Sequence, residues 1–172
     1  MADQLSEQEF GRLIHEHQGI IHKVCRVYGR TKAEREDLFQ EILIRLWKGL
    51  SSFREEAKLS TWLYRVALNT AISEQRKWKR RIRFDPLPEQ PLPSPDTAAS
   101  EEEGAQIDAL YRGIEQLKPV EKAIILLYLE EKSYQEIAEI TGLSKSNVSV
   151  RLVRIRRKLD TIVQSFLNAA SL

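Results

Sequence analysis

Cysteine, glycine and proline are scarce in this chain of 172 residues. Cys25 is the single cysteine, which excludes an internal disulfide framework and fits a reducing cytosol. The first residues are polar and acidic, unlike a secretory signal peptide, and no apolar run approaches the roughly 18 residues that span a bilayer. We therefore expect a cytoplasmic protein with no membrane insertion.

Charge of one sign is missing from particular stretches rather than from the whole chain, whose formal net charge is only +2. Residues 76–83 contain six Lys or Arg and no acid, whereas residues 84–111 contain no basic residue. Nucleic-acid binding would therefore depend on local clusters of charge, because the total charge is too small to attract a polyanion.

Strand-like alternation is weak, and apolar residues recur instead at the i, i+3, i+4, i+7 spacing of one helix face. Such stripes cover residues 10–28 and 38–50, and a capping box precedes each of them, at Ser6–Glu9 and Thr31–Glu34. A third helix is predicted over about residues 60–81. The sequence therefore predicts an all-α fold.

A proline-rich, acidic segment separates two helical regions. Residues 86–95 hold five prolines, and the surrounding segment is too polar to bury a core of its own. Helical spacing returns at Ile107. We predict two small helical domains, residues 1–83 and 106–172, joined by a flexible linker of residues 84–105.

The second domain contains a motif in residues 133–159, "SYQEIAEITGLSKSNVSVRLVRIRRKL". Ser133 and Glu136 form a capping box, and Ala138 is small enough to let another helix cross closely. Gly142 lies where the chain must turn sharply, and Ser144 can cap the next helix. The inward face of that helix is formed by Val148, Leu152, Ile155 and Leu159. The motif predicts a helix-turn-helix.

The outer face of its second helix is basic, since no acid occurs from residue 140 to residue 159. Such a helix fits a DNA major groove, with cations on phosphates, polar residues on base edges and Val150 on a thymine methyl. The simpler alternative is a helical hairpin with a solvated basic face. The candidate DNA-contacting residues are Lys145, Ser146, Asn147, Ser149, Val150, Arg151, Arg154 and Arg157.

The third predicted helix carries an aromatic, an amide and then cations at helical spacing. This pattern suits single-stranded DNA, because unpaired bases can stack on aromatic rings and an amide can read an exposed base edge. Alternatively, Trp62 and Trp78 are core residues. The second helix presents polar residues with an apolar Ile44 among them, which is typical of a protein-binding patch.

The segments "EDLFQEILIRLW" (36–47) and "STWLYRVALNTA" (60–71), followed by the helix-turn-helix, resemble bacterial RNA polymerase sigma factors. The short two-domain layout is similar to the extracytoplasmic-function group. The resemblance implies that the chain directs core polymerase to promoters and helps to melt the minus-ten region. The linker would then thread through the polymerase toward the RNA exit path.

The resemblance also implies roles for individual residues. In this family the second helix docks on the clamp helices of the polymerase largest subunit, with Leu38 and Trp47 packing behind the polar contacts. The implied docking residues are Asp37, Leu38, Gln40, Glu41 and Ile44. The implied minus-ten residues are Trp62, Arg65, Asn69, Ser73, Arg76, Lys77, Arg80 and Arg81.

The helix-turn-helix would read the minus-35 element. Recognition helices of the family often carry a basic residue followed by serine where this chain has Ser149 and Val150, so a more apolar contact pattern is expected. The implied partners are RNA polymerase core and promoter DNA, and an anti-sigma factor is common in this group, although no residue here identifies one.

Other functions find less support. His15, His17 and His22 could suggest a zinc site, but His17 lies on an apolar stripe and there is only one thiol, so we expect no metal and no cofactor. No nucleophile elbow or phosphate-binding loop stands out, so we expect no enzyme. The alternative is a one-component helix-turn-helix regulator that binds duplex DNA without polymerase.

Overall fold

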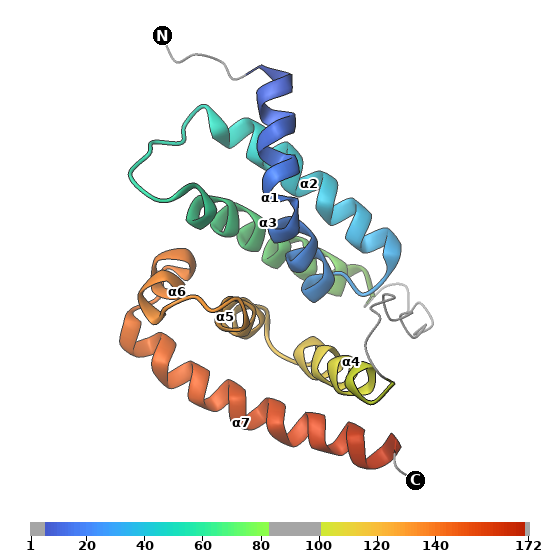
Figure 1. Cartoon of the computed structure of the whole chain (residues 1–172). Helices are drawn as coiled ribbons and strands as arrows, with labels where there is room; N and C mark the ends of the chain where they lie inside the picture. The colour runs from blue at the N-terminus through green and yellow to red at the C-terminus, as the bar shows by residue number, and fades with distance from the viewer. Residues whose placement is uncertain (1–5, 83–100, 171–172) are drawn as a thin grey trace. The chain divides into compact units, whose positions relative to one another are not determined.

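The computed structural model describes residues 6–82 and 101–170, and every regular element in these two stretches is an α-helix. The chain divides into two compact units between Pro88 and Glu89, with α1 to α3 in the first and α4 to α7 in the second (Figure 1). The prediction of an all-α protein with two helical domains is confirmed.

The first unit consists of α1 (Glu7–Tyr28), α2 (Lys32–Leu50) and α3 (Leu59–Ile82), drawn in blue to green in Figure 1. Each helix packs against the other two, because each buries one apolar face in a shared core. The most deeply buried side chains of this core include Ile21, Val24, Tyr28, Leu38, Ile42, Leu46, Leu63 and Ala67.

Both predicted capping boxes of this unit are present. The Ser6 hydroxyl accepts a hydrogen bond from the Glu9 amide at 3.3 Å, and the Glu9 carboxylate accepts one from the Ser6 amide at 2.8 Å. The hydrogen bond from the Ser6 backbone lowers the pKa of the Glu9 carboxyl below its usual range. Thr31 and Glu34 repeat the arrangement at the start of α2.

The corner between α1 and α2 requires a glycine for reasons of space. A Cβ atom on Gly29 would lie 2.6 Å from the Arg35 Cγ and 3.0 Å from the Arg35 backbone nitrogen. The Arg35 side chain in turn donates from Nε to the Gly29 carbonyl at 3.0 Å. The absence of a side chain at Gly29 therefore lets α2 start close to the end of α1.

The second unit consists of α4 (Glu101–Glu115), α5 (Pro119–Leu129), α6 (Tyr134–Thr141) and α7 (Lys145–Ala170). Its longest helix, α7, continues well past the helix-turn-helix and packs against α4. Gly113 of α4 allows a close approach, since a Cβ there would lie 3.1 Å from the Leu159 Cδ2 atom. The Arg112 guanidinium adds a contact 6.0 Å from the centre of the Phe166 ring.

The predicted C-terminal boundary of the linker, at residue 105, is wrong. α4 begins at Glu101, so residues 101–105, which were assigned to the linker of residues 84–105, are helical. The acidic residues 101–103 were interpreted as part of the linker because the linker is itself acidic. Acids are, however, favourable in the first turn of a helix, because they face the positive end of its dipole. The prolines and the rest of the predicted linker lie in residues 83–100, outside the described residues.

The turn after α5 offers a test of backbone strain. Glu131 has a φ of 57°, and the amide of Lys132 bonds back to the Leu127 carbonyl at 3.0 Å, as in a Schellman motif. Because only glycine adopts this conformation without cost, Glu131→Gly should raise the free energy of unfolding by about 0.5–1 kcal/mol.

Chemical denaturation of the whole chain, followed by circular dichroism, measures this effect. Glu130→Gly is the matched control, because Glu130 has a φ of −83° and gains nothing from glycine. The control should lower the free energy of unfolding by up to about 1 kcal/mol. Equal destabilisation by both substitutions would show that the turn at Glu131 stores no strain.

Candidate polymerase and nucleic-acid interfaces

The helix-turn-helix is built as its sequence predicts. α6 ends at Gly142, whose φ of 75° is left-handed, and the Gly142 amide bonds to the Ala138 carbonyl at 2.9 Å. The Ser144 hydroxyl accepts from the Asn147 amide at 3.2 Å and so caps α7. Ile137 and Ala138 of α6 are buried, as are the predicted inward residues Val148, Leu152, Ile155 and Leu159 of α7.

The predicted DNA-contacting residues lie on the outer face of α7. The half-buried members are Ser149 and Arg151, and the exposed ones are Lys145, Ser146, Asn147, Val150, Arg154 and Arg157. Val150 is 51% exposed, and sequence reasoning missed Val153, which is 49% exposed three residues further on. Helical spacing could have predicted this pair, because residues i and i+3 lie on the same side of a helix. The two valines add exposed apolar area to a face that is otherwise basic and polar.

The cations of α7 differ in what they contact. The Lys158 ammonium lies 3.4 Å from the Glu121 carboxylate of α5, and the Arg156 guanidinium lies 5.6 Å from the centre of the Tyr128 ring. Arg151 donates from Nε to the Asn147 Oδ1 atom at 2.9 Å. The cations toward the α5 side therefore contact α5, while those of the predicted face lie along the outer surface of the domain.

A row of exposed polar and basic residues runs along α3. Four of them recur at intervals of four, four and three residues and are all exposed, and we call them the α3 row: Arg65, Asn69, Ser73 and Arg76. Lys77, Arg80 and Arg81 are also exposed and extend the positive charge toward the end of the helix. The structure thus brings seven of the eight predicted minus-ten residues onto exposed positions of one helix.

The eighth residue, Trp62, is half-buried. Its ring lies 5.1 Å from the Phe53 ring in the connection between α2 and α3, and its Cζ2 atom would meet a Cβ on Gly49 at 3.2 Å. Trp62 therefore anchors the α2–α3 connection with one part of its ring and leaves the rest accessible. Sequence reasoning missed Phe53, because no periodic pattern covers that connection.

The basic end of α3 also carries an acid. Glu74 forms an ion pair with Lys77 at 2.9 Å, so the charge of this one cation is partly compensated. Trp78 is half-buried, and the neighbouring Gln75 is buried with its Oε1 atom lacking a hydrogen-bond partner.

The outer face of α2 combines acids with an apolar side chain. Asp37 and Gln40 are exposed, Glu41 accepts from the Arg45 Nε atom at 2.9 Å, and Ile44 is 46% exposed. These residues recur at i, i+3, i+4 and i+7 and therefore share one side of the helix. We call Asp37, Gln40, Glu41 and Ile44 the α2 face.

Two expectations for α2 need correction. Leu38 is 0% exposed, so it belongs to the core and cannot itself contact a partner, although it does support the α2 face from behind. Trp47 does not pack behind the polar residues: it is 43% exposed, with its ring edge-on to Phe10 at 4.9 Å. Trp47 lies in the last turns of α2, and its ring contact is with Phe10 in the first turn of α1.

The histidines do not come together. His22 stacks on Phe39 with ring centres 4.8 Å apart, and His15 is within 3.5 Å of the Gln18 amide. Among residues 6–82 and 101–170, no three His, Cys, Asp or Glu side chains are placed to hold a metal ion.

The helices in those stretches also include none that is both long and apolar enough to cross a membrane.

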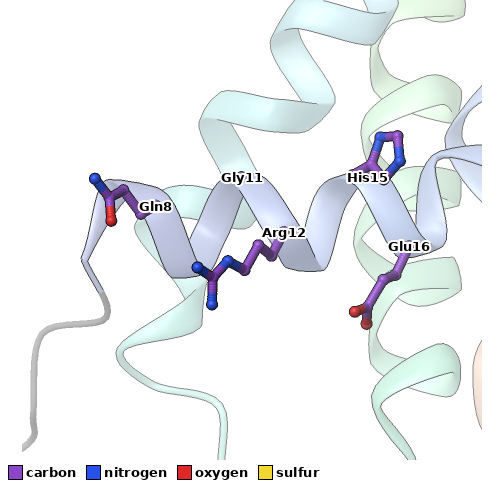
Figure 2. Close-up of a pocket in the computed structure, with 5 residues that line it drawn as sticks. All are labelled: Gln8, Gly11, Arg12, His15 and Glu16. Atoms are coloured by element: carbon purple, nitrogen blue, oxygen red, sulfur yellow. The ribbon is translucent and has the colours of Figure 1, made fainter.

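A concavity on α1 is lined by Gln8, Gly11, Arg12, His15 and Glu16 (Figure 2). All five residues are exposed and come from this one helix. Arg12 and Glu16 point to one side and His15 points away from them, so their polar groups do not converge on a common ligand position (Figure 2).

The thiol of Cys25 is 3% exposed, and burial raises its pKa to about 12. Because the pKa of Cys25 is 9.0 in the unfolded chain and about 12 in the folded one, its contribution to the free energy of unfolding is fully present below pH 9.0. That contribution is lost as the pH rises through about 12.

Because the thiolate is the reactive form, we expect iodoacetamide to modify Cys25 at pH 8 at least about a hundredfold more slowly in the folded chain than in denaturant. Equal rates, measured by mass spectrometry, would contradict this burial.

Two family models match the chain, one for each unit. Sigma-70 region 2 matches residues 13–82, which contain the α2 face and the α3 row. Sigma-70 region 4 matches residues 107–159, which contain the helix-turn-helix. The matched segments thus coincide with the surfaces described above.

Among curated proteins, the chain is 32% identical over 158 residues to the ECF RNA polymerase sigma-E factor of Escherichia coli K12, covering 83% of this chain and 82% of that protein. It is 27% identical over 159 residues to the ECF sigma factor SigM of Mycobacterium tuberculosis, covering 90% of this chain and 76% of that protein.

Among solved structures, the fold is similar to that of the sigma factor RpoE in its complex with the anti-sigma factor NepR from Bartonella quintana. The TM-score is 0.75 at 20% identity, over 91% of this chain and 98% of that chain. The identity to the E. coli protein, the two family models and this shared fold agree. The chain belongs to the extracytoplasmic-function group of the sigma-70 family and is a sigma factor that directs RNA polymerase to promoters.

Proposed function

We propose that the two units divide promoter recognition, so that the first binds core polymerase and melts the minus-ten region while the second reads the minus-35 element. The observation that carries this proposal is the α3 row, in which an amide and cations are exposed along one helix of a unit that lacks the helix-turn-helix. Duplex reading needs a groove-fitting helix, which α7 provides, and strand capture needs a separate surface.

The α2 face is the proposed docking surface for the clamp helices of the polymerase largest subunit. It offers two acids, an amide and a 46% exposed isoleucine, a combination of charge and apolar area that suits a protein partner. The adjacent Trp47, 43% exposed, extends the apolar area toward the end of α2. An exposed tryptophan beside such a face is typical of residues that contribute strongly to binding.

The α3 row is the proposed site of strand capture. Between Arg65 and Arg76 the helix rises about 16 Å, which is long enough to follow several nucleotides. The amide of Asn69 can donate to and accept from the edge of an unpaired base, and the neighbouring cations can hold phosphates. The accessible part of the Trp62 ring offers a surface on which a base can stack.

An anti-sigma factor is a further proposed partner. The sigma factor RpoE, whose fold is similar, was solved in complex with the anti-sigma factor NepR, and CnrH, also of similar fold, was solved in complex with the cytosolic domain of CnrY. The exposed apolar side chains of this chain, Ile44 and Trp47 among them, would suit an inhibitor that covers the polymerase-docking surface.

The test is run-off transcription with purified core polymerase on a library of genomic fragments, with start sites mapped by sequencing. The proposal requires defined start sites that depend on the added chain, each preceded by two separate sequence elements. Core polymerase alone is the control. A chain that binds duplex DNA tightly as a dimer but starts no transcript with core polymerase would instead be a one-component regulator.

A further inference from the structure

The start of α7 contains a hydrogen bond between two residues of the predicted recognition face. The Arg151 Nε–H group donates to the Asn147 Oδ1 atom at 2.9 Å, one helical turn away. The backbone of Asn147 is held by the helix cap, because its amide donates to the Ser144 hydroxyl at 3.2 Å. The Asn147 side chain therefore projects from a capped first turn, and its Oδ1 atom orients the Arg151 side chain.

This hydrogen bond limits what Asn147 can read. An asparagine that recognises adenine uses its side-chain oxygen and nitrogen together, and here one lone pair of the oxygen already accepts from Arg151, which restricts how the amide can turn toward a base. This restriction favours an indirect role for Asn147 over the base-edge contact that the sequence predicts for the early polar residues of this helix.

The same bond prepares Arg151 for one kind of contact. With Nε committed to Asn147, the guanidinium presents its two Nη groups end-on, which is a geometry for bidentate bonding to the O6 and N7 atoms of guanine. A free arginine side chain loses considerable conformational entropy when it is fixed on a base, and a preformed bond reduces that loss. Arg154 and Arg157 lie three and six residues further along the exposed surface of α7, where a role on phosphates is sufficient.

We propose that Asn147 is a positioning residue that orients Arg151 to read a guanine in the upstream promoter element. The proposal rests on the proposed function, in which α7 reads that element. It assigns the base contact to Arg151 and an indirect role to Asn147, so both residues should govern the same base pair.

The experiment uses holoenzyme assembled from core polymerase and the full chain, transcribing a template library randomised across the upstream element. Sequencing of the transcribed templates gives the base preference at every position. Arg151→Ala should reduce the guanine preference at one position at least about tenfold, and Asn147→Ala should reduce it about threefold to tenfold at that same position. The double variant should match Arg151→Ala, because the two residues act as one unit.

Two further variants separate positioning from folding. Asn147→Asp keeps an oxygen acceptor for Arg151, so the guanine preference should stay within about twofold of wild type, although the added negative charge near phosphates lowers overall promoter binding. Gln164→Ala removes another exposed amide of α7 and should leave every base preference unchanged. Thermal melting should be unaltered in Asn147→Ala, since the Ser144 cap bonds its backbone amide.

Several outcomes would overturn the proposal. Asn147→Ala could alter a different position from Arg151→Ala, which would make Asn147 a base reader in its own right. Arg151→Ala could weaken all templates uniformly, which would make it a phosphate contact. A wild-type holoenzyme that initiates but shows no upstream preference would overturn both this assignment and the proposed role of α7, whereas a failure confined to the Asn147 variants would overturn this assignment alone.

Discussion

Replacing Asp37 and Glu41 together by lysine is expected to abolish binding of the chain to core RNA polymerase. The double substitution changes the charge of the α2 face by four units while leaving Leu38 and the rest of the core untouched. It also removes the partner of Arg45, which lies 2.9 Å from the Glu41 carboxylate, and places a like charge beside it. Like-charge contacts across an interface cost several kcal/mol, so the affinity should fall at least about a thousandfold.

Fluorescence titration of labelled core polymerase with the chain measures this loss, and co-purification gives a second readout. The matched control is Glu16→Lys with Glu115→Lys, which makes the same charge change at two exposed acids of other helices, outside the α2 face. Its binding should stay within about tenfold of wild type, because exposed charges far from a contact act mainly through screened attraction. Unchanged binding of the Asp37 and Glu41 variant would show that polymerase docks elsewhere.

Asn69→Ala should impair promoter melting more than it impairs the first recruitment of polymerase to closed duplex. Asn69 is exposed in the middle of the α3 row, so its amide is available to an unpaired base and is not needed by the core. Losing one base contact of about 1–3 kcal/mol should lower the fraction of open complex about five- to hundredfold at promoters where melting is limiting. Alanine is the better helix former, so the stability of α3 should not decrease.

Permanganate reactivity of unpaired thymines reports melting, and gel shifts at low temperature report closed complexes. Asn168→Ala, which removes an exposed asparagine from α7 outside the predicted contacts, is the control and should match wild type in both assays. Permanganate patterns identical to wild type in the Asn69 variant would assign strand capture to other residues of the row. A parallel loss in both assays would indicate a general binding defect instead.

Much of the fold follows from local chemistry, which is why the sequence predicts it well. The capping boxes at Ser6, Thr31 and Ser133 all form, because each depends only on two side chains three residues apart. The turn at Gly142 and the inward face of α7 are likewise set by one glycine and one helical period.

The errors arise where the outcome depends on distant parts of the chain. Leu38 and Trp47 fit the same apolar stripe of α2, yet one is fully buried and the other is 43% exposed. The difference reflects which parts of α1 and α3 lie opposite each residue, and periodicity within α2 carries no such information. The contact between Phe53 and Trp62 is similar, since it joins an irregular connection to a helix.

The candidate surfaces were predictable as faces but not as contacts. Helical spacing places Arg65, Asn69, Ser73 and Arg76 together, and it places Asn147 one turn from Arg151. It does not reveal that Arg151 bonds to Asn147 or that Lys77 pairs with Glu74, because each depends on the choice of one side-chain rotamer among several.

The burial of Cys25 has a practical consequence for spectroscopy. Since the native Cys25 is 3% exposed and has a raised pKa, a cysteine introduced at an exposed serine outside the proposed contacts, such as Ser51 in the first unit or Ser165 in the second, should react with maleimide dyes without competition. A doubly labelled chain would then report the separation of its two units by energy transfer, both free and on the polymerase. The native Cys25 does not have to be removed to make that measurement.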